Sequence, residues 1–297
     1  MEISMNPDTS NPFVYGQVLM PGRPYCSRPT LEKQVLQAAR SRQRMVLLGD
    51  RRIGKSSLVE HTLGEAGELF LTIELRGLAS AADFIDRLSV GLEAFLNHNR
   101  ALTKKIPPAL QVALEHIEKL RISIPGLIGV ELKPKPVAST VIQAMQTVSK
   151  VSEWRPFTVF LDEFQEISDS LEPKEANHLL GVLRAEIQRQ SKVSYIFAGS
   201  AKTTMRDLFT NPDSHFYQSA AILEVGAIPV EDMWRFVEQQ FRHGHRQLDP
   251  NMANAIFALA GESPNDIQQL CYHLWSRSSP GLIGQTELKA ALTNSSR

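Results

Sequence analysis

The run Met45-Val46-Leu47-Leu48-Gly49-Asp50-Arg51-Arg52-Ile53-Gly54-Lys55-Ser56 decides the fold of this chain. Its four leading apolar residues predict a buried strand that ends at Gly49, and residues 55–63 predict a helix. The loop between them fits Gly-x-x-x-x-Gly-Lys-Ser/Thr, a pattern in which backbone N–H groups and a helix start surround phosphate. The two glycines permit backbone angles and a close approach that a Cβ would block. The run therefore predicts a phosphate-binding loop.

The residues of this loop have separate expected roles. Lys55 is expected to reach the β- and γ-phosphates, and the Ser56 hydroxyl to ligate Mg²⁺. The residues expected to bind the nucleotide here are Gly49, Asp50, Arg51, Arg52, Ile53, Gly54, Lys55, Ser56 and Ser57. A chance Gly-rich turn explains neither the Lys-Ser pair nor the flanking strand and helix.

A second apolar run, Phe157–Leu161, ends in Asp162 and Glu163. It predicts a buried strand that delivers two carboxylates to one edge of a sheet. Asp162 is expected to hold Mg²⁺ through water, and Glu163 to act as general base toward the attacking water. An acidic strand end is common by itself, but its pairing with a phosphate loop favours the hydrolytic interpretation.

A third apolar run, Val193–Ala198, is followed by Gly199 and Ser200. In sheets of this type that strand lies between the other two, so Ser200 is expected to sense the γ-phosphate, with Lys202 as an auxiliary. An N-cap serine for a helix over 203–209 explains Ser200 equally well. Both interpretations stay open.

Strands and helices alternate through most of the chain. Further strands are expected at 69–75 and 222–225, and helices at 31–42, 81–95, 137–151 and 174–190. This alternation predicts an α/β fold, a P-loop NTPase three-layer sandwich with a parallel sheet. Prolines interrupt residues 100–136, expected to be an insertion with a helix at 110–120 and a hairpin around 122–132. After Pro229 the pattern is wholly helical (230–242, 250–260, 264–277 and 286–292), which predicts a C-terminal helical lid.

The amino-acid composition limits the classes of function that the chain can have. Lys+Arg and Asp+Glu are each 32 among 297 residues, so the chain lacks the overall basic excess that duplex-DNA binders often show. A local basic patch stays open. Cys26 and Cys271 fit neither a metal spacing nor a disulfide framework. The polar first ten residues and the lack of a long apolar run predict no signal peptide, no membrane span and a cytoplasmic location.

The class of nucleotide follows from two absent motifs. The chain has no Asn-Lys-x-Asp segment of the kind by which GTPases read guanine, and no Leu-Ser-Gly-Gly-Gln signature of ABC ATPases. Adenine is therefore favoured as the base, and ATP with Mg²⁺ is the predicted cofactor pair.

Four segments carry a family resemblance. They are the opening Asn11-Pro12-Phe13-Val14-Tyr15-Gly16, the box Pro24-Tyr25-Cys26-Ser27-Arg28, the double-arginine phosphate loop with Ser57 and Leu58, and the turn Gly261-Glu262-Ser263-Pro264. Together they resemble the archaeal-type ATPases of the STAND (signal-transduction ATPase) group, relatives of the AAA+ and origin-recognition ATPases. One departure is Ser27, which replaces the glycine of the family's Phe-Val-Gly-Arg box.

The resemblance implies a nucleotide switch. It places the base between the box at Tyr25–Arg28 and Pro264, so Arg28 and Pro264 join the residues expected to bind nucleotide. As the first residue of a helix, Pro264 has an equally good structural explanation. The domains expected on this basis are an arm with an adenine box at 1–30, an ATPase core at 31–226 and a lid at 227–297.

The resemblance also bears on partners. Family members usually carry a further winged-helix or effector domain, and this chain ends at Arg297 just after the lid, which favours a separate protein as the output. An arginine finger would come from a neighbouring subunit, and Arg184 and Arg206 are its candidates. The leading hypothesis is an ATP-hydrolysing regulatory switch that acts through protein partners or self-assembly. The alternative is a DNA-associated AAA+-like ATPase of transposition or replication type.

Overall fold

The computed structural model of the chain describes residues 10–19, 21–100, 115, 137–200 and 202–292. It divides into two compact units. The sheet unit comprises Lys33–Asp50 and Ala66–Glu224, and the helical unit comprises Met1–Glu32, Arg51–Glu65 and Val225–Arg297. The domain limits at 30 and 226 expected from the sequence remain a prediction.

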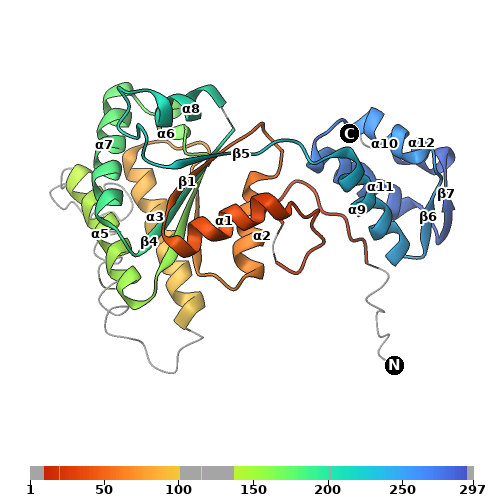
Figure 1. Cartoon of the computed structure of the whole chain (residues 1–297), viewed down its shortest axis with the longest axis horizontal. Coiled ribbons are helices and arrows are strands. Elements are labelled where there is room, and N and C mark those ends of the chain that lie inside the picture. Colours follow the sequence, from red (N-terminus) through yellow and green to blue (C-terminus); the bar gives the residue numbers. More distant parts are fainter. Residues whose placement is uncertain (1–9, 20, 101–114, 116–136, 201, 293–297) are drawn as a thin grey trace, which may run out of the picture. The chain divides into compact units, whose positions relative to one another are not determined.

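Figure 1 shows the sheet unit, with its strands β1, β4 and β5 labelled. Its sheet has five parallel strands in the order β2-β3-β4-β1-β5. The strands are β1 Arg44–Leu48, β2 Phe70–Glu74, β3 Phe157–Asp162, β4 Val193–Gly199 and β5 Ala221–Glu224. Every residue of β3 and β4 is buried, as expected for parallel strands that are covered on both faces. Because β4 lies between β1 and β3, the sequence-based order of these three strands is confirmed.

Helices cover both faces of this sheet, which confirms the predicted α/β sandwich. They are α1 Pro29–Ser41, α3 Ala81–Arg100, α5 Val137–Trp154, α6 Glu166–Ser170, α7 Pro173–Arg189 and α8 Lys202–Thr210. One face contributes Val46, Val159 and Phe197 to a core shared with α3, α5 and α7. On the opposite face, the Ser194 hydroxyl donates to the Ala38 carbonyl of α1 (3.3 Å).

The helical unit contains α2 Lys55–Glu65, α9 Val230–His243, α10 Met252–Ala260, α11 Pro264–Arg277 and α12 Gln285–Leu292. The prediction of a wholly helical segment after Pro229 is wrong, because two short strands, β6 Arg246–Leu248 and β7 Gly281–Ile283, pair in parallel. The Arg246 guanidinium holds the start of β6 by donating to the Ser278 carbonyl (2.9 Å) and lying over the Trp275 ring. Strands of three residues are too short to show an alternating pattern.

The N-terminal arm is part of the helical unit's core. Phe13 is 1% exposed and packs against the rings of Phe236, Phe241 and Trp275. The Asn11 side chain donates to the Tyr272 carbonyl of α11 (2.9 Å). Burial of the Phe13 ring thus attaches the arm to the helical unit.

The predicted insertion at 100–136, with its helix and hairpin, lies almost wholly outside the residues that the structure describes. Among the helices in the described ranges, none has the length and apolar character needed to cross a membrane.

Candidate functional site

The predicted phosphate loop connects the end of β1 to the start of α2. Gly54 has a φ of 88° and Arg52 a φ of 60°, so the loop uses two left-handed residues. Glycine adopts this conformation freely, whereas it costs a residue with a side chain about 1–2 kcal/mol. The Leu58 amide donates to the Gly54 carbonyl (2.9 Å), so helical hydrogen bonding begins at the loop. The N-terminal end of α2 thus lies at the loop. Helix N-termini bind anions through their free amide groups and the helix dipole.

The three residues that open α2 have different surroundings. Lys55 is 7% exposed, an unusual degree of burial for a lysine. Ser56 is half-buried. The Ser57 hydroxyl accepts a hydrogen bond from the Leu19 amide of the arm (3.1 Å). The side chain of Ser57 therefore helps to attach the arm to α2.

The two arginines of the loop are exposed. Arg52 lies 3.6 Å from the Asp266 carboxylate in the first turn of α11, with the two side chains 70% and 35% exposed. An ion pair this exposed contributes well under about 1 kcal/mol. It nevertheless shows that the loop and α11 are neighbours within the helical unit.

The residues expected near the base also belong to the helical unit. Tyr25 stacks on the His61 ring of α2 with the centroids 4.2 Å apart. The buried guanidinium of Arg28 donates to the carbonyl oxygens of Ile53 and Gly226. Pro264 opens α11, as its structural explanation requires, and is also buried.

The two predicted carboxylates end β3 at the carboxyl edge of the sheet. Asp162 is 4% exposed, and its Oδ1 accepts a hydrogen bond from the Glu163 amide (3.0 Å). Glu163 has a φ of 53°, a left-handed conformation that costs such a residue energy and is often found at functional sites. The register pairs Leu48 of β1 with Gly199 of β4, so the loop leaves the sheet at this same edge.

Glu163 is surrounded by hydrogen-bond donors. Its Oε2 accepts from Gln165 Nε2 (2.6 Å) and from the Ser200 hydroxyl (2.7 Å), and its Oε1 from Arg76 Nη2 (3.2 Å). Burial alone raises the pKa of Glu163, but the bonds from Gln165, Ser200 and Arg76 outweigh it and hold the pKa below its usual value. The structure thus brings Glu163 and Ser200 together, and it keeps Glu163 ionised.

Gln165 and Gly199 were not singled out from the sequence. Gln165 is 3% exposed, and a Cβ added at Gly199 would lie only 2.2 Å from Gln165 Oε1. Glycine at 199 therefore allows the Gln165 side chain to approach β4 and reach Glu163. The glycine that ends β4 is visible in the sequence, but no sequence pattern connects it with Gln165.

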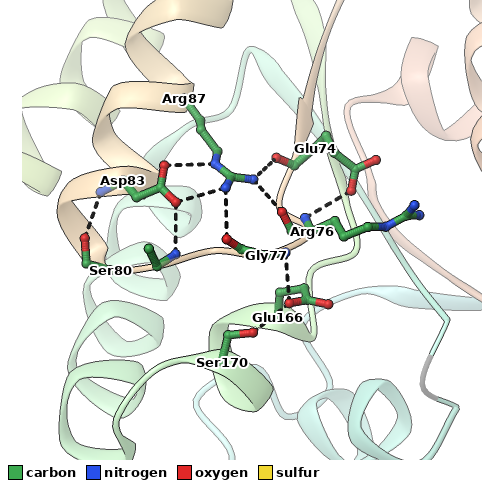
Figure 2. Close-up of polar contacts among 9 residues, drawn as sticks. Glu74, Arg76, Gly77, Ser80, Asp83, Arg87, Glu166 and Ser170 are labelled. Atoms are coloured by element: carbon green, nitrogen blue, oxygen red, sulfur yellow. Dashed lines mark hydrogen bonds and ion pairs between the residues drawn. The ribbon is translucent and has the colours of Figure 1, made fainter.

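Arg76 is the third donor, and its main-chain amide and carbonyl belong to a polar network (Figure 2). Arg87 of α3 donates to the carbonyls of Glu74, Arg76 and Gly77 and pairs through two bonds with Asp83. The Gly77 amide donates to Glu166 of α6 (3.2 Å). The turn after β2 is thus attached to both α3 and α6, which holds the backbone of Arg76 in place while its side chain stays 61% exposed.

The other predicted cations have local partners. Arg206 pairs with Glu224, and Arg184 Nε donates to the His215 carbonyl (3.1 Å). For Lys202 the structure describes the backbone only. Within the described ranges, no group of three or more His, Cys, Asp or Glu side chains is placed to hold a metal.

The sequence matches no protein-family model, and a search of curated proteins found no match. Solved structures do resemble it. The Walker-type ATPase paby2304 of Pyrococcus abyssi has a TM-score of 0.70 at 16% identity, over 94% of this chain and 75% of that chain. The Aeropyrum pernix ORC2 protein, solved as ADPNP–ADP complexes, has a TM-score of 0.54 at 13% identity, over 93% of this chain and 70% of that chain. This chain therefore has the α/β P-loop NTPase fold.

Proposed function

We propose that the chain binds ATP with Mg²⁺ at Gly49–Ser56 and hydrolyses it. One observation carries the proposal: β1 leads into the phosphate loop at the sheet edge where β3 ends in Asp162 and Glu163, with Ser200 on the strand between them. The proposed general base Glu163 thus follows β3, and Ser200, which is able to contact phosphate, follows the adjacent strand β4.

The residues divide the chemistry among themselves. The Lys55 ammonium and the amides of the loop bind the β- and γ-phosphates, and the Ser56 hydroxyl and the Asp162 carboxylate hold the metal ion. Mg²⁺, when bound, neutralises and orients the phosphate oxygens. Glu163 takes a proton from the attacking water.

Glu163 must change partners to do so. Three side chains donate to its two oxygens, and they make it a weak base by lowering its pKa. The Ser200 hydroxyl is the donor that can turn to a phosphate oxygen, because it ends β4 beside the loop strand β1. When it does so, Glu163 gains a lone pair for water and becomes more basic.

We further propose that the nucleotide state is read by protein partners or by further copies of the chain, in the cytoplasm. The contact between Arg52 of the loop and Asp266 of α11 supports a switch, because it connects the proposed phosphate site with the C-terminal helices. The loop, the arm and these helices belong to one compact unit. The alternative is a DNA-associated ATPase of replication type. Its support is the likeness to the ORC2 protein, and the zero net charge does not favour it.

Replacing Glu163 by glutamine tests the proposal. Glutamine keeps the shape but cannot take a proton from water, so ATP turnover should fall roughly 10²–10⁴-fold while ATP still binds. Glu153→Gln, an exposed substitution on α5, is the matched control and should hydrolyse at the wild-type rate. Wild-type turnover by Glu163→Gln would show that the base lies elsewhere. Stimulation of turnover by duplex DNA would favour the alternative.

A further inference from the structure

Arg28 is buried in a way that its expected role at the base does not explain. The side chain is 9% exposed, and its two Nη atoms donate to main-chain carbonyls, Nη2 to Ile53 and Nη1 to Gly226 (3.3 Å). Its Nε is buried and has no hydrogen-bond partner within the part of the chain that the structure describes. The guanidinium therefore points at the backbone of the phosphate loop.

Burying this cation is costly. Burial lowers the pKa of Arg28, although Tyr25, Cys26 and, least, the Glu32 carboxylate partly counteract it. That carboxylate accepts hydrogen bonds from the backbone amide of Arg28 and from the Ser27 hydroxyl (2.9 Å). Two neutral carbonyls compensate a buried charge only in part. An anion bound on the other side of the loop would complete the compensation.

The geometry of a peptide group indicates how Arg28 acts on such an anion. In a trans peptide the C=O and N–H bonds point in opposite directions, so fixing the Ile53 carbonyl on Arg28 aims the Gly54 amide away from Arg28. A cation on the carbonyl also polarises the peptide and makes its N–H a stronger donor. A Cβ at Gly54 would lie 3.4 Å from Arg28 Nη2, so the two groups are already in close contact.

We propose that Arg28 is a positioning residue that orients and polarises the Ile53–Gly54 peptide, so that the Gly54 amide donates to a nucleotide phosphate. The inference rests on the proposed function, because it requires a phosphate in the loop. The second contact of Arg28, from Nη1 to the Gly226 carbonyl, ties the loop to the point where the chain enters the C-terminal helices. Arg28 thus acts on the phosphates through the backbone and makes no contact with the base.

Ligands with and without phosphates distinguish a role of Arg28 at the phosphates from a contact with the base and from a purely structural role. ADP, GDP and adenosine are titrated against Arg28→Gln, Arg28→Lys and the wild type, by competition with a fluorescent ADP analogue. Arg28→Gln should bind ADP and GDP about tenfold or more weakly, as for loss of a charged hydrogen bond, and adenosine as the wild type does. Arg28→Lys keeps the charge and should recover part of the loss. Arg40→Gln, whose exposed side chain pairs with Glu68, is the matched control.

Each other outcome has a distinct meaning. An equal loss for adenosine and ADP, or a changed ratio of ADP to GDP affinity, would show that Arg28 contacts the base and would overturn the inference. Unchanged ADP affinity in a folded Arg28→Gln or Arg28→Lys protein would leave Arg28 with a purely structural role. If the wild type binds no ADP, the proposed function itself fails. Thermal unfolding of each variant without nucleotide shows whether the variant is folded. If Arg28→Gln does not fold, the ADP affinity of Arg28→Lys tests the inference.

Discussion

Replacing Gln165 by methionine tests how Glu163 is held. Methionine matches glutamine in length but has no donor, so the 2.6 Å bond from Nε2 to Glu163 Oε2 is lost. Both residues are buried, at 3% and 7% exposure, so water cannot readily replace it. A hydrogen bond to a charged group contributes about 1.5–3 kcal/mol, and we expect the free energy of unfolding at pH 7 to fall by about 2 kcal/mol.

The pH dependence gives the sign of the effect. The folded-state pKa of Glu163 is lowered, so its contribution to stability is fully present above the unfolded-state pKa, about 4.3, and is lost as the pH falls through the folded-state value. The difference between Gln165→Met and the wild type should therefore be full at pH 7 and shrink below about pH 4.

Urea unfolding of the nucleotide-free protein at a series of pH values measures this difference. Gln34→Met, an exposed substitution on α1, is the matched control and should change stability by less than about 0.5 kcal/mol. A loss of the same size at pH 7 and well below pH 4 would refute the reasoning, because it would come from packing and not from the ionised carboxylate.

Three further predictions concern Gly199, Phe13 and the C-terminal helices. Gly199→Ala should lower the free energy of unfolding by about 1–3 kcal/mol, because the added Cβ would lie 2.2 Å from Gln165 Oε1. The same substitution should lower ATP turnover. Gly284→Ala, where the nearest atom to the added Cβ is 3.9 Å away, is the control for both measurements. Phe13→Ala should cost about 3–5 kcal/mol in urea unfolding, because a fully buried ring is lost; a loss below 1 kcal/mol would show that the arm is not part of the core. Hydrogen exchange in α9 and α11 should slow with a non-hydrolysable ATP analogue and slow less with ADP; equal protection would contradict a switch.

The strands β1, β3 and β4 could be predicted because each is a mostly apolar run with a clear end. β3 and β4 are buried throughout and stop at polar residues, so their composition reveals both their type and their limits. The position of Ser200 beside Glu163 follows from the strand order, which the phosphate loop and the acidic strand end together imply.

Other features leave no local pattern. Arg76 reaches Glu163 across 87 positions of sequence, and only the pairing of β2 with β3 brings them together. Gln165 belongs to an ordinary polar stretch, and its role depends on space left by Gly199. The box residue Arg28 resembles a family motif, but its carbonyl partners are main-chain atoms, which side-chain sequence does not specify.

The central claim is that nucleotide binds at the loop between β1 and α2. Calorimetric titration of ATP with Mg²⁺ into the Glu163→Gln protein, with and without the further change Lys55→Ala, tests it most directly because hydrolysis does not interfere. We predict saturable binding of one ATP per chain, and loss of at least tenfold in affinity when Lys55 is replaced, since its ammonium binds the β- and γ-phosphates. Absence of ATP binding in the folded Lys55-containing protein, or equal affinity in both proteins, would contradict the account.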